Sequence, residues 1–229
     1  MVKNHMKRLV MPTTWTTQQK KGIKWITRTN AGSHSLEEGM PLVLILREML
    51  HHANTAREVK QILQNQTVLV DGTRRKDHRF NVGFMDTVSI PLLKESYRVS
   101  IDSNGRLSVL KIDEKEAKEK LCKIKGKGLF QGKTQLQLSD GRNVLVEKGS
   151  YKTGDSIVIT VPEQKIQSHV AFEKGATVLL TGGKKVGVIG TVEEIKENIV
   201  KIKAEKETFE TAKRYCFVVG KQKPALTIN

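Results

Sequence analysis

The feature that most constrains the fold is a series of short segments, from about residue 97 onward, in which apolar and polar residues alternate. Examples are residues 97–101 (YRVSI), 134–138 (TQLQL) and 156–160 (SIVIT), and glycine-containing turns separate many of them. A period of two places alternate side chains on opposite faces, as in a β-strand with one face on a core. Short strands at this spacing are typical of small barrels or sandwiches. Only residues 113–120 (DEKEAKEK) interrupt the pattern, and they predict a short charged helix.

Helical signals are concentrated before this region. Ser35, followed by Leu36 and two glutamates, predicts an N-cap for a helix that runs through residues 41–50. Asn54 or Thr55 caps a second predicted helix over residues 56–64, and strands then follow up to Pro91. The sequence therefore predicts an α+β multidomain chain.

The 229-residue chain has 40 Lys and Arg against 24 Asp and Glu, a net charge of +16. A polyanionic partner is the leading interpretation, and a basic protein that is merely soluble is the alternative. The excess is spread along the sequence, which favours several modules on one long anion over a single basic tail.

Residues 1–35 lack sustained periodicity and have too few apolar residues for a core of their own. We expect this arm to become ordered only on binding. Trp15 and Trp25 lie among its lysines, so each can either stack on a base or pack on the rest of the protein.

Metal, cofactor and membrane functions are not indicated. Two cysteines supply neither a disulfide framework nor four zinc ligands, and the adjacent His51 and His52 would point about 100° apart on a helix. The other four histidines have no Cys or carboxylate partner at ligand spacing. The longest aliphatic run, residues 42–46, is too short to span a bilayer, and no signal peptide is indicated, so we expect a cytoplasmic protein without a small-molecule substrate.

The stretch TGGKKVGVIGTVEEI, residues 181–195, superficially suggests a nucleotide site. A P-loop requires Lys and Ser/Thr directly after its second glycine, but Val188 and Ile189 follow Gly187. A dinucleotide-binding turn leads into a helix, whereas residues 191–193 favour a strand. The glycines therefore predict a hairpin, with Lys184 and Lys185 at its exposed tip.

Residues 41–91 resemble the alpha-L RNA-binding domain of the small-subunit ribosomal protein four and its relatives. The similarity rests on Leu46-Arg47, on Thr55-x-Arg57-Glu58-Val59, and on residues 68–72 (VLVDG) with basic residues after them. Pseudouridine synthases also contain this domain, but their G-R-L-D motif is matched here only by Gly105-Arg106-Leu107-Ser108. Because serine lacks the catalytic carboxylate, we predict that the protein is not an enzyme.

Residues 175–195 resemble the KOW motif of ribosomal and elongation proteins. The order of modules is similar to that of the four-e family of archaeal and eukaryotic small-subunit ribosomal proteins, and the chain ends in the archaeal manner, without the basic extension of eukaryotic members. Further matches include HMKRL at residues 5–9, GFMD at 83–86 and FVVGK at 217–221. The family usually has an Arg-Pro-rich stretch where residues 28–34 (RTNAGSH) stand here, so contacts of the arm are its least secure implication.

The resemblance implies four segments: a basic RNA-binding arm (1–40), an alpha-L domain (41–93), a central β-rich domain (94–172) and a KOW β-barrel domain with a C-terminal segment (173–229). It also implies a structural constituent of the small ribosomal subunit that binds small-subunit ribosomal RNA, in its 5′ domain, and meets neighbouring ribosomal proteins. A free RNA-binding regulatory or elongation factor is the alternative. The candidate RNA-binding residues are Lys3, Lys7, Arg8, Lys20, Lys21, Lys24, Arg28, Arg47, Arg57, Lys60, Gln61, Arg74, Arg75, Lys76, Arg79, Lys123, Lys125, Lys127, Lys184 and Lys185.

Overall fold

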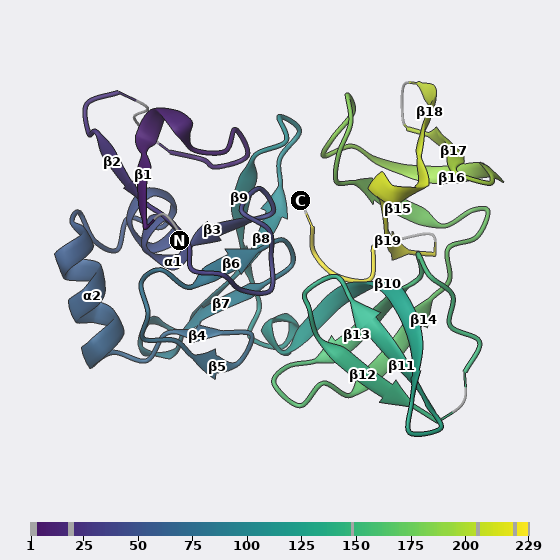
Figure 1. Cartoon of the computed structure of the whole chain (residues 1–229), viewed down its shortest axis with the longest axis horizontal. Helices are drawn as coiled ribbons and strands as arrows, with labels where there is room; N and C mark the ends of the chain where they lie inside the picture. The colour runs from purple at the N-terminus through teal and green to yellow at the C-terminus, as the bar shows by residue number, and fades with distance from the viewer. Residues whose placement is uncertain (1–3, 18–20, 148, 205–206, 222–223, 229) are drawn as a thin grey trace. The chain divides into compact units, whose positions relative to one another are not determined.

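The computed structural model describes residues 4–17, 21–147, 149–204, 207–221 and 224–228. The chain forms two compact units (Figure 1). Unit 1 comprises Met1–Ser100 and Arg106–Lys118, and unit 2 comprises Ile101–Gly105 and Glu119–Asn229. The structure is mostly β-strand with few helices, so the predicted α+β class gives too much weight to the helices. The division into four segments is finer than these two units and remains a prediction.

Unit 1 is built on a five-stranded sheet with the order β5-β4-β7-β8-β9. These strands are β4 (Leu69–Val70), β5 (Thr73–Arg74), β7 (Thr87–Ile90), β8 (Glu95–Ile101) and β9 (Leu107–Ile112). Two strand pairs accompany the sheet: β1 (His5–Lys7) with β2 (Trp25–Thr27), and β3 (Gly39–Pro41) with β6 (Asn81–Gly83). Short 3₁₀ turns are η1 (Arg8–Val10), η3 (Pro91–Leu93) and η4 (Glu116–Lys118).

The first predicted helix starts later than expected. The Ser35 hydroxyl does accept a hydrogen bond from the Glu38 amide at 3.2 Å, but this turn is followed by strand β3. Pro41 explains the boundary, because proline lacks an amide hydrogen and disfavours helical backbone in the residue before it. The helix is therefore limited to α1 (Leu42–Leu44) and the π-helical η2 (Ile45–Met49). Residues 42–46 are fully buried and form much of the core of unit 1.

The second helix, α2 (Ala56–Asn65), forms as predicted. Thr55 is its cap: the threonine hydroxyl accepts from the Glu58 amide, and the Glu58 carboxylate accepts from the Thr55 amide. This reciprocal arrangement satisfies two donors that a helix start otherwise leaves unpaired. Val59 and Leu63 are buried on the same face, and this face fixes the direction in which the polar residues of α2 point.

The first sheet of unit 2 has the order β12-β11-β10-β13-β14. Its strands are β10 (Glu119–Phe130), β11 (Lys133–Leu138), β12 (Asn143–Val146), β13 (Ser156–Thr160) and β14 (Ile166–Val170). Residues 119–123 of β10 pair with β13, and residues 124–130 pair with β11. The register shifts between Ile124 and Gly126, so Lys125 occupies a bulge at the point where β10 changes partner.

The predicted charged helix over residues 113–120 is wrong. Only η4 is helical in this segment, and β10 already begins at Glu119. Lys120 is buried and forms an ion pair with Asp140 at 3.1 Å, while Glu119 pairs with Thr160 in the β10–β13 ladder. Long-range pairing therefore overrides the local helical preference of this charged segment.

The second sheet of unit 2 has the order β18-β17-β16-β15-β19. It consists of β15 (Thr177–Leu180), β16 (Ile189–Lys196), β17 (Ile199–Lys203), β18 (Thr208–Ala212) and β19 (Cys216–Gly220), with a 3₁₀ turn η5 (Lys213–Tyr215). Val178, Val192, Val200, Ile202 and Val218 are in its core.

The glycine-rich stretch that resembles a nucleotide loop contains the connection between β15 and β16. Gly187 has a φ of 79°, in the left-handed region that favours glycine. A Cβ on Gly190 would lie 2.8 Å from the carbonyl oxygen of Lys203 on the neighbouring strand β17. These glycines therefore shape the hairpin between β15 and β16, as predicted, and Lys184 and Lys185 are exposed at its tip.

The arm is folded in the parts of it that the structure describes, contrary to the expectation that it becomes ordered only on binding. Trp15 is 2% exposed, and its indole nitrogen donates to the carbonyl oxygens of Leu36 at 3.0 Å and Gly39 at 2.8 Å. Trp15 is thus a packing residue. Trp25 is 50% exposed, with Lys24 5.4 Å from its ring centroid.

This contrast gives a paired test of the two tryptophans. We expect Trp15→Ala to lower the free energy of unfolding of unit 1 by about 3–5 kcal/mol, because a large buried side chain is removed. Trp25→Ala should change it by less than about 1 kcal/mol. Guanidinium unfolding followed by far-ultraviolet circular dichroism measures both, and an equal loss for the two variants would contradict the assignment of Trp15 to the core.

Candidate RNA-binding surface

The polar face of α2 presents three side chains from the predicted RNA-binding set. Arg57, Lys60 and Gln61 are exposed, opposite the buried Val59 and Leu63. The spacing of a helix explains this arrangement, since residues three or four apart share a face. The capping box at Thr55 fixes where the helix starts, and therefore which residues face solvent.

The end of β5 lies beside α2, and a basic loop follows it. Arg74 is exposed, and its guanidinium donates to the Gln64 carbonyl of α2 at 3.2 Å. The pKa of His78, at the far end of the loop, is lowered by burial and by the nearby positive charge of Lys60. Lys76, between them in sequence, is exposed.

The end of the arm extends the same surface. The Arg79 guanidinium donates to the Arg28 carbonyl at 3.1 Å, and the Asn30 amide donates to the Arg79 carbonyl at 2.9 Å. Two hydrogen bonds to backbone carbonyls thereby join residues 28–30 of the arm to Arg79. We call the resulting set the α2 basic surface; it comprises Arg28, Arg57, Lys60, Gln61, Arg74, Lys76 and Arg79.

Three further arginines of the predicted set contact side chains within the protein. Arg8 is 3% exposed and donates to both carboxylate oxygens of Glu48 at 3.1 Å, so it holds the arm onto η2. Arg47 donates to the same carboxylate at 2.7 Å but stays partly exposed. Arg75 stacks on Phe80, with its guanidinium carbon 4.3 Å from the ring centroid. The structure thus gives Arg8 and Arg75 structural roles that their charge alone did not indicate.

Lys123 also has an internal role. Its amine donates to the carbonyls of Arg214 at 3.1 Å and Cys216 at 2.6 Å, which ties β10 to the start of β19. Burial lowers the pKa of this amine, and the charges of Lys125 and Lys213 act in the same direction. Lys123 is therefore a poor candidate for a phosphate contact, unlike Lys125, which is exposed two residues further along β10.

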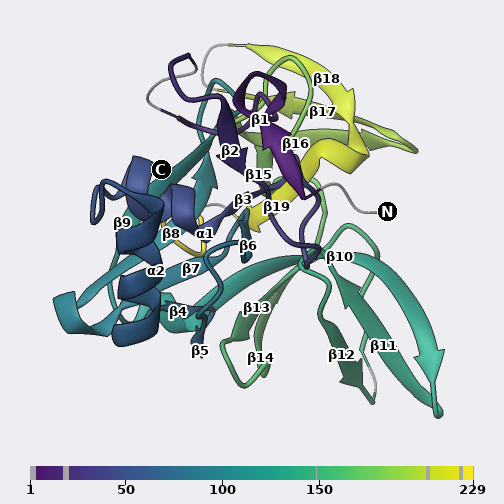
Figure 2. The same ribbon diagram turned by 60° about the vertical axis from the view of Figure 1, so that its left-hand side comes forward.

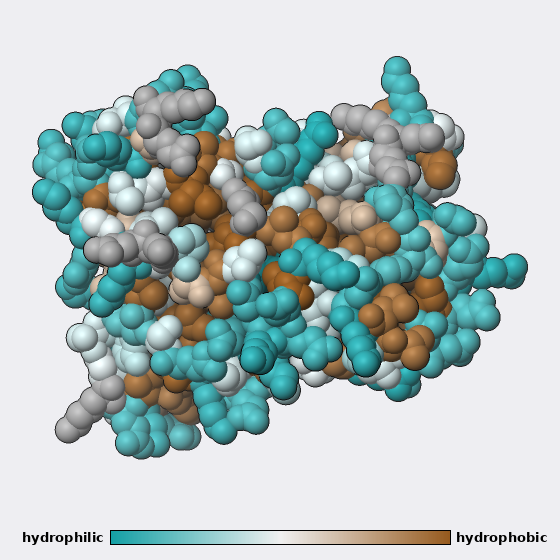
Figure 3. Space-filling view, turned by 180° about the vertical axis from the view of Figure 1, so that it is seen from behind, coloured by the Kyte–Doolittle hydropathy of each residue, from teal (hydrophilic) through white to brown (hydrophobic). Residues whose placement is uncertain are grey.

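The remaining candidates are separate from the α2 basic surface. Exposed lysines of the arm are Lys7, Lys21 and Lys24, and those of β10 and the β15–β16 connection are Lys125, Lys127, Lys184 and Lys185. Lys127 also donates to the Tyr151 carbonyl at 3.3 Å, and Lys185 pairs with Glu207 at 2.5 Å. Lys3 and Lys20 lie outside the described residues. Figure 3 shows hydrophilic residues over much of one face of the molecule.

Two histidines have carboxylate partners that sequence spacing did not indicate. His34 lies 3.0 Å from both oxygens of Asp86, and His169 lies 2.8 Å from Asp155. These partners are 52 and 14 residues away, so only the fold brings them together. Among the described residues no group of three or more His, Cys, Asp or Glu could hold a metal ion.

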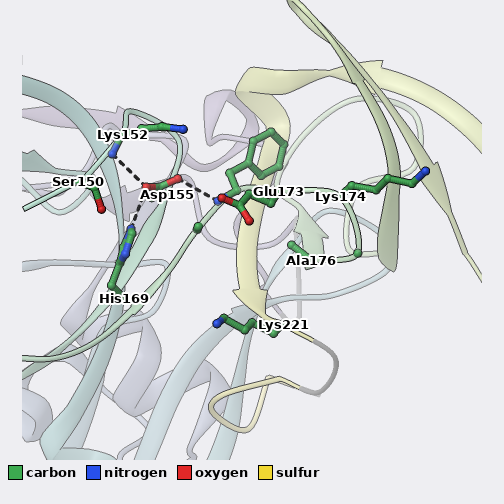
Figure 4. Close-up of a pocket in the computed structure, with 11 residues that line it drawn as sticks. Ser150, Lys152, Asp155, His169, Glu173, Lys174, Ala176 and Lys221 are labelled. Atoms are coloured by element: carbon green, nitrogen blue, oxygen red, sulfur yellow. Dashed lines mark hydrogen bonds and ion pairs between the residues drawn. The ribbon is translucent and has the colours of Figure 1, made fainter.

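A pocket of about 560 Å³ in unit 2 surrounds the second of these pairs (Figure 4). Asp155 accepts from His169, from the Lys152 amide at 3.0 Å and from the Phe172 amide at 2.9 Å. The carboxylate thus joins β14 to the turn before β13.

Ser108, which stands where pseudouridine synthases have their aspartate, lies in β9, and β9 follows the turn at Asp102–Gly105.

These features define a class of protein: a basic chain with small β-rich cores and an exposed cationic surface, suited to a polyanionic partner. The sequence profile of the ribosomal family S4e matches residues 93–166. The small ribosomal subunit protein eS4 of Methanosphaera stadtmanae is 46% identical over 99% of this chain and 96% of its own length. The protein of the same name from Methanocella arvoryzae is 42% identical over 97% of each chain.

A solved structure gives the same result. The crystal structure of the 30S ribosomal protein S4e from Thermoplasma acidophilum matches with a TM-score of 0.70 and 33% identity, covering 80% of this chain and 95% of that one. The chain belongs to the ribosomal S4e family. No helix in the described part of the chain has the length and apolar character needed to cross a membrane.

The different surroundings of Lys123 and Lys125 give a matched test. We expect Lys123→Met to lower the free energy of unfolding of unit 2 by about 1–3 kcal/mol, because two carbonyls lose a charged donor. It should leave the salt dependence of binding to small-subunit ribosomal RNA unchanged. Lys125→Met should do the reverse: little change in stability and a shallower salt slope in filter binding. A shallower slope for Lys123→Met at unchanged stability would contradict the structural role of Lys123.

Proposed function

We propose that this protein is a structural constituent of the small ribosomal subunit that binds and stabilises small-subunit ribosomal RNA. The α2 basic surface carries the proposal, because it gathers six cationic side chains from a helix, a loop and the arm. The names of its relatives, which are small ribosomal subunit proteins, support the same assignment. No turnover is involved, since the role of the side chains is to neutralise and position the RNA.

The geometry of the α2 basic surface suits an RNA backbone. Arginine and lysine side chains on one helix face and an adjacent loop can meet successive phosphates, and they release condensed counterions when they do so. Contacts to phosphate and to 2′-hydroxyls recognise the shape of an RNA helix and need no base readout. Arg74 and Arg79 donate to backbone carbonyls of other segments, so they are held in place before RNA arrives.

We further propose the finer module assignments. Residues 41–93 would form the alpha-L RNA-binding domain, with α2 on the RNA, and residues 173–229 the KOW domain, with Lys184 at the tip of its first hairpin. Residues 1–40 would act as a basic arm, and residues 94–172 as a central β-rich domain. Neighbouring small-subunit proteins are the expected protein partners, and the cytoplasm is the expected location.

Association with the ribosome is tested by sucrose-gradient centrifugation of a cell extract. We expect the protein to sediment with small subunits and to stay with them after a high-salt wash, because several basic sites hold one RNA together. Recovery of the washed protein at the top of the gradient would contradict a structural role and favour a free RNA-binding factor.

The α2 basic surface is tested by the double variant Arg74→Gln/Lys76→Gln, in which Arg75 is kept because it stacks on Phe80. Binding of the full chain to purified small-subunit ribosomal RNA should weaken. The log–log salt slope should become shallower by about 0.7–0.9 for each phosphate that the variant no longer neutralises.

The control is Lys165→Gln/Lys196→Gln, which removes the same charge from exposed positions that already pair with Glu163 and Glu194. If the control reduces the slope as much as the loop variant, then net charge rather than the α2 basic surface explains binding.

A further inference from the structure

The strands β10, β11 and β12 have one face that does not point into the core of unit 2. Cross-strand register places Gly126 opposite Gln137, and Gly128 opposite Gln135, which in turn is opposite Leu145. The alternate residues Leu136 and Leu138 are buried in the core. The outer face therefore carries Gly126, Gly128 and Phe130 of β10, and Figure 2 shows this strand running with β11 as a long ribbon.

Gly128 on this face has no explanation within the chain. Its φ lies outside the left-handed region, so no turn or bulge requires glycine there. A Cβ built on Gly128 would have nothing within 4 Å, so no described neighbour needs the space. Glycine inside a strand is unfavourable, and it commonly marks a place where a ligand or another backbone approaches closely. No described residue of this chain makes such an approach to Gly128.

The residues around Gly128 fit a flat, partly apolar partner. Phe130, two positions along the same face, is 49% exposed, and Leu145, across the sheet, is 50% exposed. The turn between β10 and β11 is only two residues long, with positive φ at Gln131 and Gly132, so the register that presents Phe130 is fixed. An exposed aromatic ring beside a bare stretch of backbone is a platform on which a base can stack.

Charge favours a nucleic acid over a basic protein neighbour. Residues 124–132 contain Lys125 and Lys127 and no acidic residue. Lys125 is exposed in the bulge at the start of this stretch. At the far end of the hairpin, the Glu147 carboxylate pairs with Lys133 at 2.9 Å.

We propose that the outer face of the β10–β11 hairpin is a second RNA contact, distinct from the α2 basic surface. An unpaired base of small-subunit ribosomal RNA stacks on Phe130, and its sugar–phosphate backbone passes over Gly128 toward Lys125. The inference rests on the proposed function, since it takes the ribosomal RNA as the partner.

The first test uses the opposite effects that Gly128→Val should have on folding and on binding. The variant should unfold at the same denaturant concentration as the wild type or a higher one, because valine suits a strand and has room. Its affinity for purified small-subunit ribosomal RNA should fall by about 5- to 100-fold, the range expected when one base no longer stacks.

Phe130→Ala should lower the affinity by a similar factor. The control Ile199→Ala, which removes a similarly exposed apolar side chain from β17, should leave the affinity unchanged. Unchanged affinity for Gly128→Val and Phe130→Ala would overturn the proposal.

The second test identifies what lies against the hairpin. A photoreactive benzoylphenylalanine at position 130 of the full chain, assembled into small subunits, should cross-link to ribosomal RNA. Cross-linking of position 130 to a ribosomal protein would overturn the proposal. So would the absence of any cross-link from position 130 when the same group at position 61 cross-links to RNA. In either case the gradient and the Arg74→Gln/Lys76→Gln variant still test the ribosomal role separately, so failure of this contact is distinguishable from failure of the proposed function.

Discussion

A charge that is removed from water must be paired, and this constraint divides the basic residues of the protein into two sets. Arg8 with Glu48, Arg98 with Glu116, and Lys120 with Asp140 are ion pairs with a buried cation. Burial acts to raise the pKa of Asp140, but the charges of Lys120 and Arg142 outweigh it, so the pKa is lowered. That pair therefore stabilises the fold above the pKa of an unfolded aspartate, and the stabilisation is lost as pH falls through the lowered folded value. Loss of one partner from such a pair costs about 3–5 kcal/mol.

The exposed cations outside these pairs include those of the α2 basic surface, which we propose to lie on RNA. Exposed ion pairs contribute little to stability, so lysines and arginines on the surface are free to serve another partner at small cost to the fold. On α2 and the loop after β5 they are brought together by a capping box and by hydrogen bonds from arginines to backbone carbonyls. The same architecture that buries Val59 and Leu63 therefore presents Arg57, Lys60 and Gln61 to solvent.

Sequence patterns predicted the parts of the fold that depend on local periodicity. The strands after residue 97, the capped helix α2 and the hairpin at Gly187 all follow from alternation, capping and turn residues. The errors fall where distant residues decide. Residues 119–120 are strand because β13 and Asp140 hold them, and the arm is folded because Trp15 inserts into unit 1. Charge alone could not show that Lys123 is bound internally whereas Lys125 is exposed, because the carbonyls that bind Lys123 are more than 90 residues away in sequence.

We propose that the α2 basic surface lies on ribosomal RNA. A density map of the intact small ribosomal subunit from the source cells tests it most directly. We expect Arg57, Lys60 and the segment Arg74–Lys76 to face phosphates of small-subunit ribosomal RNA. A map in which this face of α2 is turned to solvent or covered by another protein would contradict it.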